Sequence, residues 1–145
     1  MKTYLAILFG GIAGTAVLTL FLLLPSYLGW GRIEVFRAVG SLMTGKSEKA
    51  VSVGVLLHVT LGILFAYMYA GFLSLSHLPF NALSGLFLGT LHGSVVMLLV
   101  GIVILEHHPV AAYHERGPAM GFVQLIAHML YGVTMGAVVS LLSAG

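Results

Sequence analysis

The sequence predicts an all-α fold, a bundle of four membrane-spanning helices in one domain over residues 1–145, and three observations predict it. First, 59% of the residues are hydrophobic and only 7% are charged, whereas a soluble globular domain carries about 25% charged residues. Second, four apolar segments each reach about the 20 residues with which a helix crosses the ~30 Å hydrocarbon core of a bilayer. Third, every Lys, Arg, Asp and Glu lies outside these segments. We therefore expect lipid to be the solvent for most of the chain.

The expected spans are residues 3–24, 51–73, 81–105 and 119–142. The first follows Met1-Lys2 and resembles a secretory signal peptide. Its apolar run is longer than such a peptide needs, however, and no small-residue cleavage site precedes Pro25. We expect it to remain as a span. Residues 74–80 form a nearly uncharged turn, and Pro118 suits the first turn of the fourth helix.

The connection over residues 25–50 has a partly amphipathic pattern. Polar and charged residues such as Arg32 and Arg37 alternate there with apolar ones. Such a pattern is typical of a short helix that lies in the membrane interface. Tyr27 and Trp30 are the aromatic residues that would anchor it at headgroup level.

The cationic residues predict the topology. Five of the six Lys and Arg residues lie in the connections 25–50 and 106–118, and only Lys2 lies on the opposite side. The positive-inside rule then places both connections in the cytoplasm and both termini outside, in the inner membrane of a bacterium or archaeon. Six cations without a clustered patch are too few for a nucleic-acid footprint, so we expect the bilayer and other membrane proteins or further copies of this chain as partners, and no nucleic acid.

Short glycine patterns suggest that the chain is two copies of one helical hairpin. Gly10-x-x-x-Gly14 in the first span matches Gly85-x-x-x-Gly89 in the third, and a His-x-x-x-Gly pattern occurs in both the second and the fourth. Such stripes of small residues let helix backbones approach closely in lipid. Two like hairpins would be related by a pseudo-two-fold axis along the membrane normal, with His58 and His128 as equivalent positions.

Three histidines lie inside three different spans: His58, His92 and His128. Counted from the same membrane side, His58 and His128 lie ~10–14 Å deep and His92 ~20 Å deep. A titratable ring at such depth is costly unless something binds it. Because the chain has no cysteine, a haem or metal must be held by other ligands, and imidazole suits both.

Two kinds of cofactor site are compatible with these three histidines. In one, His58 and His128 are the axial ligands of a haem b, and His92 is a neighbour that accepts a proton. In the other, all three imidazoles bind a copper, zinc or iron ion. The alternative without a cofactor is that each ring bonds a backbone carbonyl or a threonine of a neighbouring helix. Glu106 lies 14 residues after His92, which at 100° per residue places it near the same helix face at the mouth of the bundle.

The third connection is rich in possible metal ligands. Glu106, His107 and His108 are consecutive, and His114 follows six residues later. Short histidine-rich tracts bind transition metals, but this spacing matches no closed zinc motif. A solvated loop that titrates near neutral pH is the alternative.

The layout resembles small four-span bacterial membrane proteins that are grouped only as domains of unknown function. The matching pieces are 58–62, 85–89 and 125–132, within a layout that covers most of the chain. The resemblance brings no activity with it, and His92 and the third connection are not part of the pattern.

The function predicted from the residues is a subunit of a membrane redox complex that binds haem b or a transition metal, acting in electron transfer rather than as a stand-alone enzyme. The alternatives are an accessory subunit without a cofactor and, less favoured, a metal or proton permease.

Overall fold

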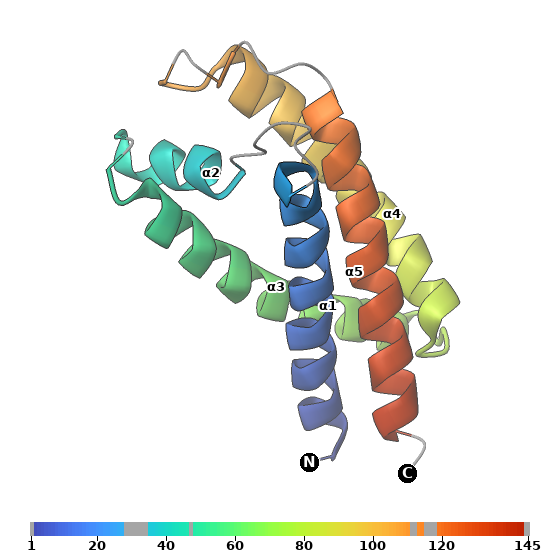
Figure 1. Cartoon of the computed structure of the whole chain (residues 1–145). Coiled ribbons are helices and arrows are strands. Elements are labelled where there is room, and N and C mark those ends of the chain that lie inside the picture. The colour runs from blue at the N-terminus through green and yellow to red at the C-terminus, as the bar shows by residue number, and fades with distance from the viewer. Residues whose placement is uncertain (1, 28–34, 47, 111–112, 115–118, 144–145) are drawn as a thin grey trace.

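The computed structural model describes residues 2–27, 35–46, 48–110, 113–114 and 119–143, and these residues form helices joined by turns (Figure 1). The elements are α1 (Lys2–Tyr27), α2 (Val35–Thr44), α3 (Ala50–Leu75), α4 (Ala82–Leu99), the π-helix η1 (Val100–Glu106) and α5 (Ala119–Ser143). Four stretches are long and apolar enough to cross a membrane: Thr3–Leu24, Ala50–Leu75, Ala82–Glu106 and Ala119–Ser143. The predicted four-span helical fold, with a short helix between the first two spans, is confirmed.

The helix ends follow local chemistry. Asn81 caps α4, because its side-chain oxygen accepts a hydrogen bond of 2.9 Å from the backbone N–H of Ser84. α1 continues past Pro25 to Tyr27, although the sequence predicts an end at residue 24. A proline so close to a helix C-terminus removes one backbone hydrogen bond without ending the helix. Of the two predicted interface anchors, Tyr27 is exposed, and Trp30 lies outside the described residues.

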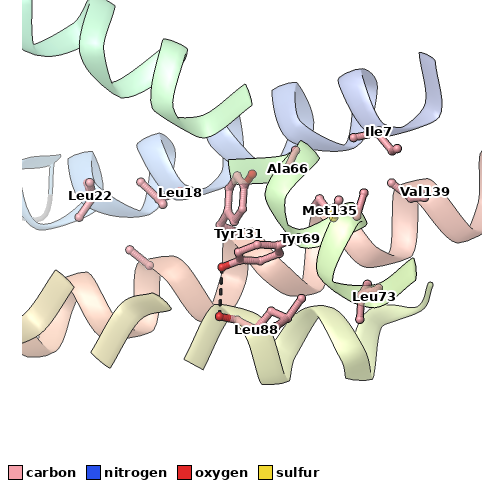
Figure 2. Packing of buried hydrophobic residues seen from close by; sticks show 12 residues of the cluster. Ile7, Leu18, Leu22, Ala66, Tyr69, Leu73, Leu88, Tyr131, Met135 and Val139 are labelled. Atoms are coloured by element: carbon pink, nitrogen blue, oxygen red, sulfur yellow. Dashed lines mark hydrogen bonds between the residues drawn. The ribbon is translucent and has the colours of Figure 1, made fainter. Parts of the chain in front are cut away.

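The core of the bundle forms around α5, which packs against both α1 and α4. α1 and α5 run side by side, and the two chain ends lie at the same end of the molecule (Figure 1). Figure 2 shows the buried cluster, to which α1, α3, α4 and α5 contribute. Tyr131 and Met135 of α5 lie in this cluster and are almost completely buried.

Glycines bring the backbones of α4 and α5 into contact. A methyl group on Gly85 would collide with the carbonyl oxygen of Gly132, and a methyl group on Gly132 would collide with that of Gly85. Close approach of this kind replaces the hydrophobic drive that helices lack in lipid. The predicted role of these glycines as packing surfaces is confirmed at this crossing.

α2 lies against the first half of α3. A side chain at Gly40 would collide with the backbone of Ala50, and one at Gly54 would collide with the backbone of Phe36. Ala38 of α2 also belongs to a second buried cluster with Val100 and Ile104 of η1. The short helix is therefore held between α3 and the end of the third span.

The two predicted hairpins share one contact and differ in another. Gly62 of α3 packs against Thr15 of α1, and Gly132 of α5 packs against Gly85 of α4, so each His-x-x-x-Gly pattern faces the preceding span. However, the backbone of α1 also packs along that of α5, whereas the backbones of α3 and α4 come close at few places. The internal repeat stays a prediction.

Candidate functional site

A cavity of about 610 Å³ lies between the membrane-spanning helices, a size within the range of sites that bind cofactors and other small molecules. All of the helices α1 to α5 contribute to its wall, together with Val100 of η1. Most of the described lining residues are apolar, and none of them is charged. The polar exceptions are Thr15, His58, His92, Gln124, His128 and Tyr131.

His58 of α3 is held by a threonine of α1. Its Nε2 lies 2.9 Å from Thr19 Oγ1, and the Thr19 hydroxyl donates its hydrogen to the carbonyl of Thr15 at 2.7 Å. Because that hydroxyl has a single hydrogen, the Nε2–H of His58 donates to Thr19. The edge of this ring also meets Phe36, with ring centroids 5.0 Å apart. The Nδ1 lone pair of a neutral His58 then remains available.

His92 of α4 shares a tyrosine hydroxyl with a backbone carbonyl. Tyr69 Oη lies 3.1 Å from the carbonyl oxygen of Leu88, to which it donates (Figure 2), and 3.1 Å from His92 Nδ1. Because the single hydroxyl hydrogen of Tyr69 is donated to the Leu88 carbonyl, the Nδ1–H of His92 donates to the tyrosine oxygen. The Nε2 of His92 then carries the free lone pair. Phe65 packs over the same ring, with a centroid distance of 3.9 Å.

His128 of α5 is oriented by its own helix. Its Nδ1–H donates to the carbonyl of Gln124 at 2.7 Å, which leaves Nε2 as the acceptor nitrogen. This is the arrangement typical of histidines that bind metals, in which the second ring nitrogen donates to a backbone carbonyl or a carboxylate. The rings of His92 and His128 meet edge to face, with centroids 4.6 Å apart.

The structure thus brings the three intramembrane histidines to one cavity, as the sequence predicts. It does not place them as a ready metal centre: within the described part of the chain, no group of three or more His, Asp or Glu residues is arranged to hold a metal ion. The alternative hydrogen bonds expected from the sequence are present as well. They join His58 to Thr19, His92 to the Tyr69 hydroxyl and His128 to the Gln124 carbonyl.

Glu106 does not line the mouth of this cavity. Its side chain is 67% exposed and lies 4.0 Å from His107 Nδ1, and it is absent from the described cavity wall. The expected shared face with His92 assumes an α-helix throughout, but residues 100–106 form a π-helix. The wider i→i+5 turn of a π-helix changes the angular register after residue 99.

The histidines of the third connection fold back onto the protein. His108 is buried, its Nδ1 accepts the Val110 N–H at 3.0 Å, and its Nε2–H donates to the Ala38 carbonyl at 2.9 Å. His114 donates to the His108 carbonyl, and His107 to the carbonyl of Ile102. The predicted metal site from Glu106, His107, His108 and His114 is not gathered among the described residues. Instead, His108 joins this loop to α2 through the Ala38 carbonyl, and we call its hydrogen bonds to Ala38 and Val110 the clasp.

Gln124 and the tyrosines of the site do not emerge from the sequence patterns. Gln124 is 2% exposed and lines the cavity. Its side-chain nitrogen has no hydrogen-bond partner within the described structure. The available signal was its place four residues before His128, which puts both side chains on one helix face. The contacts of Tyr69 and Tyr131 depend on helix packing, so spacing within one helix gives no sign of them.

Residues 1–145 match the model of a family of unknown function, DUF6789. The comparisons with curated proteins and with solved structures gave no match.

Proposed function

Because the chain belongs to DUF6789, a family of unknown function, we propose a function from its cavity: the protein is a small membrane subunit that binds haem b and takes part in electron transfer within a larger redox complex. One observation carries the proposal. Three half-buried imidazoles from three spans line one apolar cavity of about 610 Å³. When bound, haem supplies one-electron chemistry at its iron, while the protein supplies ligands, burial and orientation.

The axial ligands follow from the ring contacts. The rings of His92 and His128 contact each other directly, edge to face with centroids 4.6 Å apart. One of these two rings would therefore hold the group, and the other would be its neighbour. The proposed pair is therefore His128 and His58, with His92 beside His128 as a neighbour that accepts a proton.

The hydrogen bonds around these rings support ligand roles. The Gln124 carbonyl fixes the His128 tautomer and leaves Nε2 as the donor atom toward a metal. His58 is free at Nδ1 while Thr19 holds Nε2, and binding iron through Nε2 would require this ring to turn. A bare copper, zinc or iron ion on the three imidazoles fits less well, because the described residues form no group of three ligands.

An accessory subunit without a cofactor is the second candidate. It is favoured by the hydrogen bonds that His58, His92 and His128 already make to Thr19, Tyr69 and the Gln124 carbonyl. In that case the His58 bond ties α3 to α1 and the His92 bond ties α4 to α3, and the protein acts by packing against partner spans.

The absorption spectrum of the protein, purified from haem-supplied cells, separates these candidates. We expect a Soret band that shifts on reduction with dithionite and that is lost in His58→Ala and His128→Ala. His77→Asn is the matched control, because His77 is exposed in the turn before α4 and has a φ of 55°, which asparagine tolerates. A wild-type protein without haem that contains stoichiometric metal favours the metal ion. A folded protein with neither favours the accessory subunit.

A further inference from the structure

One residue that lines the cavity has a buried polar atom without a hydrogen-bond partner in the described structure. The Nε2 amide nitrogen of Gln124 is buried and makes no hydrogen bond among the described residues, and the whole residue is 2% exposed. A buried donor without an acceptor costs the free energy of its lost hydration. Buried polar groups in folded proteins nearly always have a partner, so the cavity lacks one acceptor atom.

The cavity is also open toward the bilayer. Leu61 of α3 and Leu91, Val95 and Leu99 of α4 line the cavity and are exposed on the outside of the bundle as well. The backbones of α3 and α4 come close at few places, although Phe65 and Tyr69 of α3 contact His92 of α4. The exposed lining residues lie on these two helices, so this opening lies between them. A molecule that reaches the cavity by this route passes through hydrocarbon and must itself be largely apolar.

Gln124 and His128 offer complementary hydrogen-bonding atoms. They lie one helical turn apart, and both line the cavity. The Gln124 amide donates, whereas His128 Nε2 accepts, because Nδ1–H is already committed to the Gln124 carbonyl. The wall thus contains a residue with an unpaired amide donor, one helical turn from a residue with a basic ring nitrogen, among mostly apolar neighbours.

We propose that Gln124 is a ligand-binding residue whose amide donates to an oxygen of the molecule held in the cavity, and that this molecule is a lipid-soluble compound bearing a carbonyl or carboxyl group. This inference deepens the proposed haem function, since haem b carries carboxyl groups on an apolar ring. The same chemistry is found in a quinone, whose ring carbonyl would accept from Gln124. Gln124 serves as the anchor for the oxygen, and the histidines contact the rest of the ring.

The test uses the full chain in nanodiscs and two probes added separately, hemin and decylubiquinone, with affinity read by titration and the bound mass read by native mass spectrometry. Gln124→Leu is compared with the wild type. Thr90→Val is the matched control, because Thr90 is a half-buried span residue outside the described cavity wall whose hydroxyl bonds the Leu86 carbonyl of its own helix. We expect Gln124→Leu to bind the accepted probe about tenfold more weakly, and Thr90→Val to bind as the wild type does. Gln124→Met serves as a second apolar replacement if the leucine variant does not fold.

The outcomes separate this inference from the haem proposal. Hemin binding that depends on Gln124 supports both. Decylubiquinone binding that depends on Gln124, without hemin binding, supports the inference and contradicts the haem proposal. Hemin binding of equal affinity in wild type and Gln124→Leu overturns the inference and leaves the haem proposal standing. Binding of neither probe overturns both.

Discussion

Two regions of this bundle are built from similar apolar helices but differ in how closely the helices pack: the contact between α4 and α5, and the region between α3 and α4. Where α4 meets α5, Gly85 and Gly132 bring the two backbones together and leave no space. Between α3 and α4 the backbones come close at few places, side chains such as Tyr69 and His92 make the contacts, and the cavity with the three histidines opens there. In lipid, helices associate by close packing, so a gap forms where small residues do not face each other. We interpret the glycine contact between α4 and α5 as the scaffold of the bundle, and the space between α3 and α4 as the place for a ligand.

The largest effect is expected from adding a methyl group at the tight crossing. Gly85→Ala places Cβ against the Gly132 carbonyl, so the helices must separate, at a cost of about 1–3 kcal/mol or more. Gly71→Ala is the control, because a Cβ on Gly71 meets nothing within 4 Å. Thermal unfolding in detergent measures both. Equal melting temperatures for the two variants would show that the crossing is not the scaffold.

A smaller effect is expected at the clasp that holds α2 over the cavity. His108→Ala removes the acceptor of the Val110 N–H and one of two side-chain donors to the Ala38 carbonyl, which keeps the Ser41 hydroxyl at 3.0 Å. The unpaired N–H costs about 1–3 kcal/mol. Hydrogen exchange in α2 should rise, whereas His107→Ala, at a side chain that is 70% exposed, should leave it unchanged. Unaltered exchange in His108→Ala would mean that the Gly40 and Gly54 contacts alone hold α2.

The smallest effect is a gain in stability on the open side. Gln124→Leu removes a buried donor that has no partner in the described residues, so the ligand-free protein should be stabilised by about 1 kcal/mol. Thermal unfolding of ligand-free protein measures this, with Thr90→Val as the reference. A lower melting temperature for Gln124→Leu would indicate that the amide has a structural role.

The same comparison shows why the sequence predicts the fold better than the site. The spans follow from composition and length, and the positions of His58, His92 and His128 inside three different spans are enough to predict that they come to one cavity. The placements of side chains that differ from the expectation depend on features that no local pattern encodes. Glu106 is turned away by a π-helix, and His108 finds its partner 70 residues earlier in the chain. The Nε2 nitrogen of Gln124 has no partner because no neighbouring helix in the described structure places an acceptor atom beside it.

The ratio of haem to protein in purified wild type and in a His58→Ala/His128→Ala double variant decides whether the cavity holds haem. We expect close to one haem per wild-type chain, with a Soret band that shifts on reduction, and none in the double variant. A wild-type protein that stays colourless in haem-supplied cells, or a double variant that keeps its full haem content, would contradict the haem proposal.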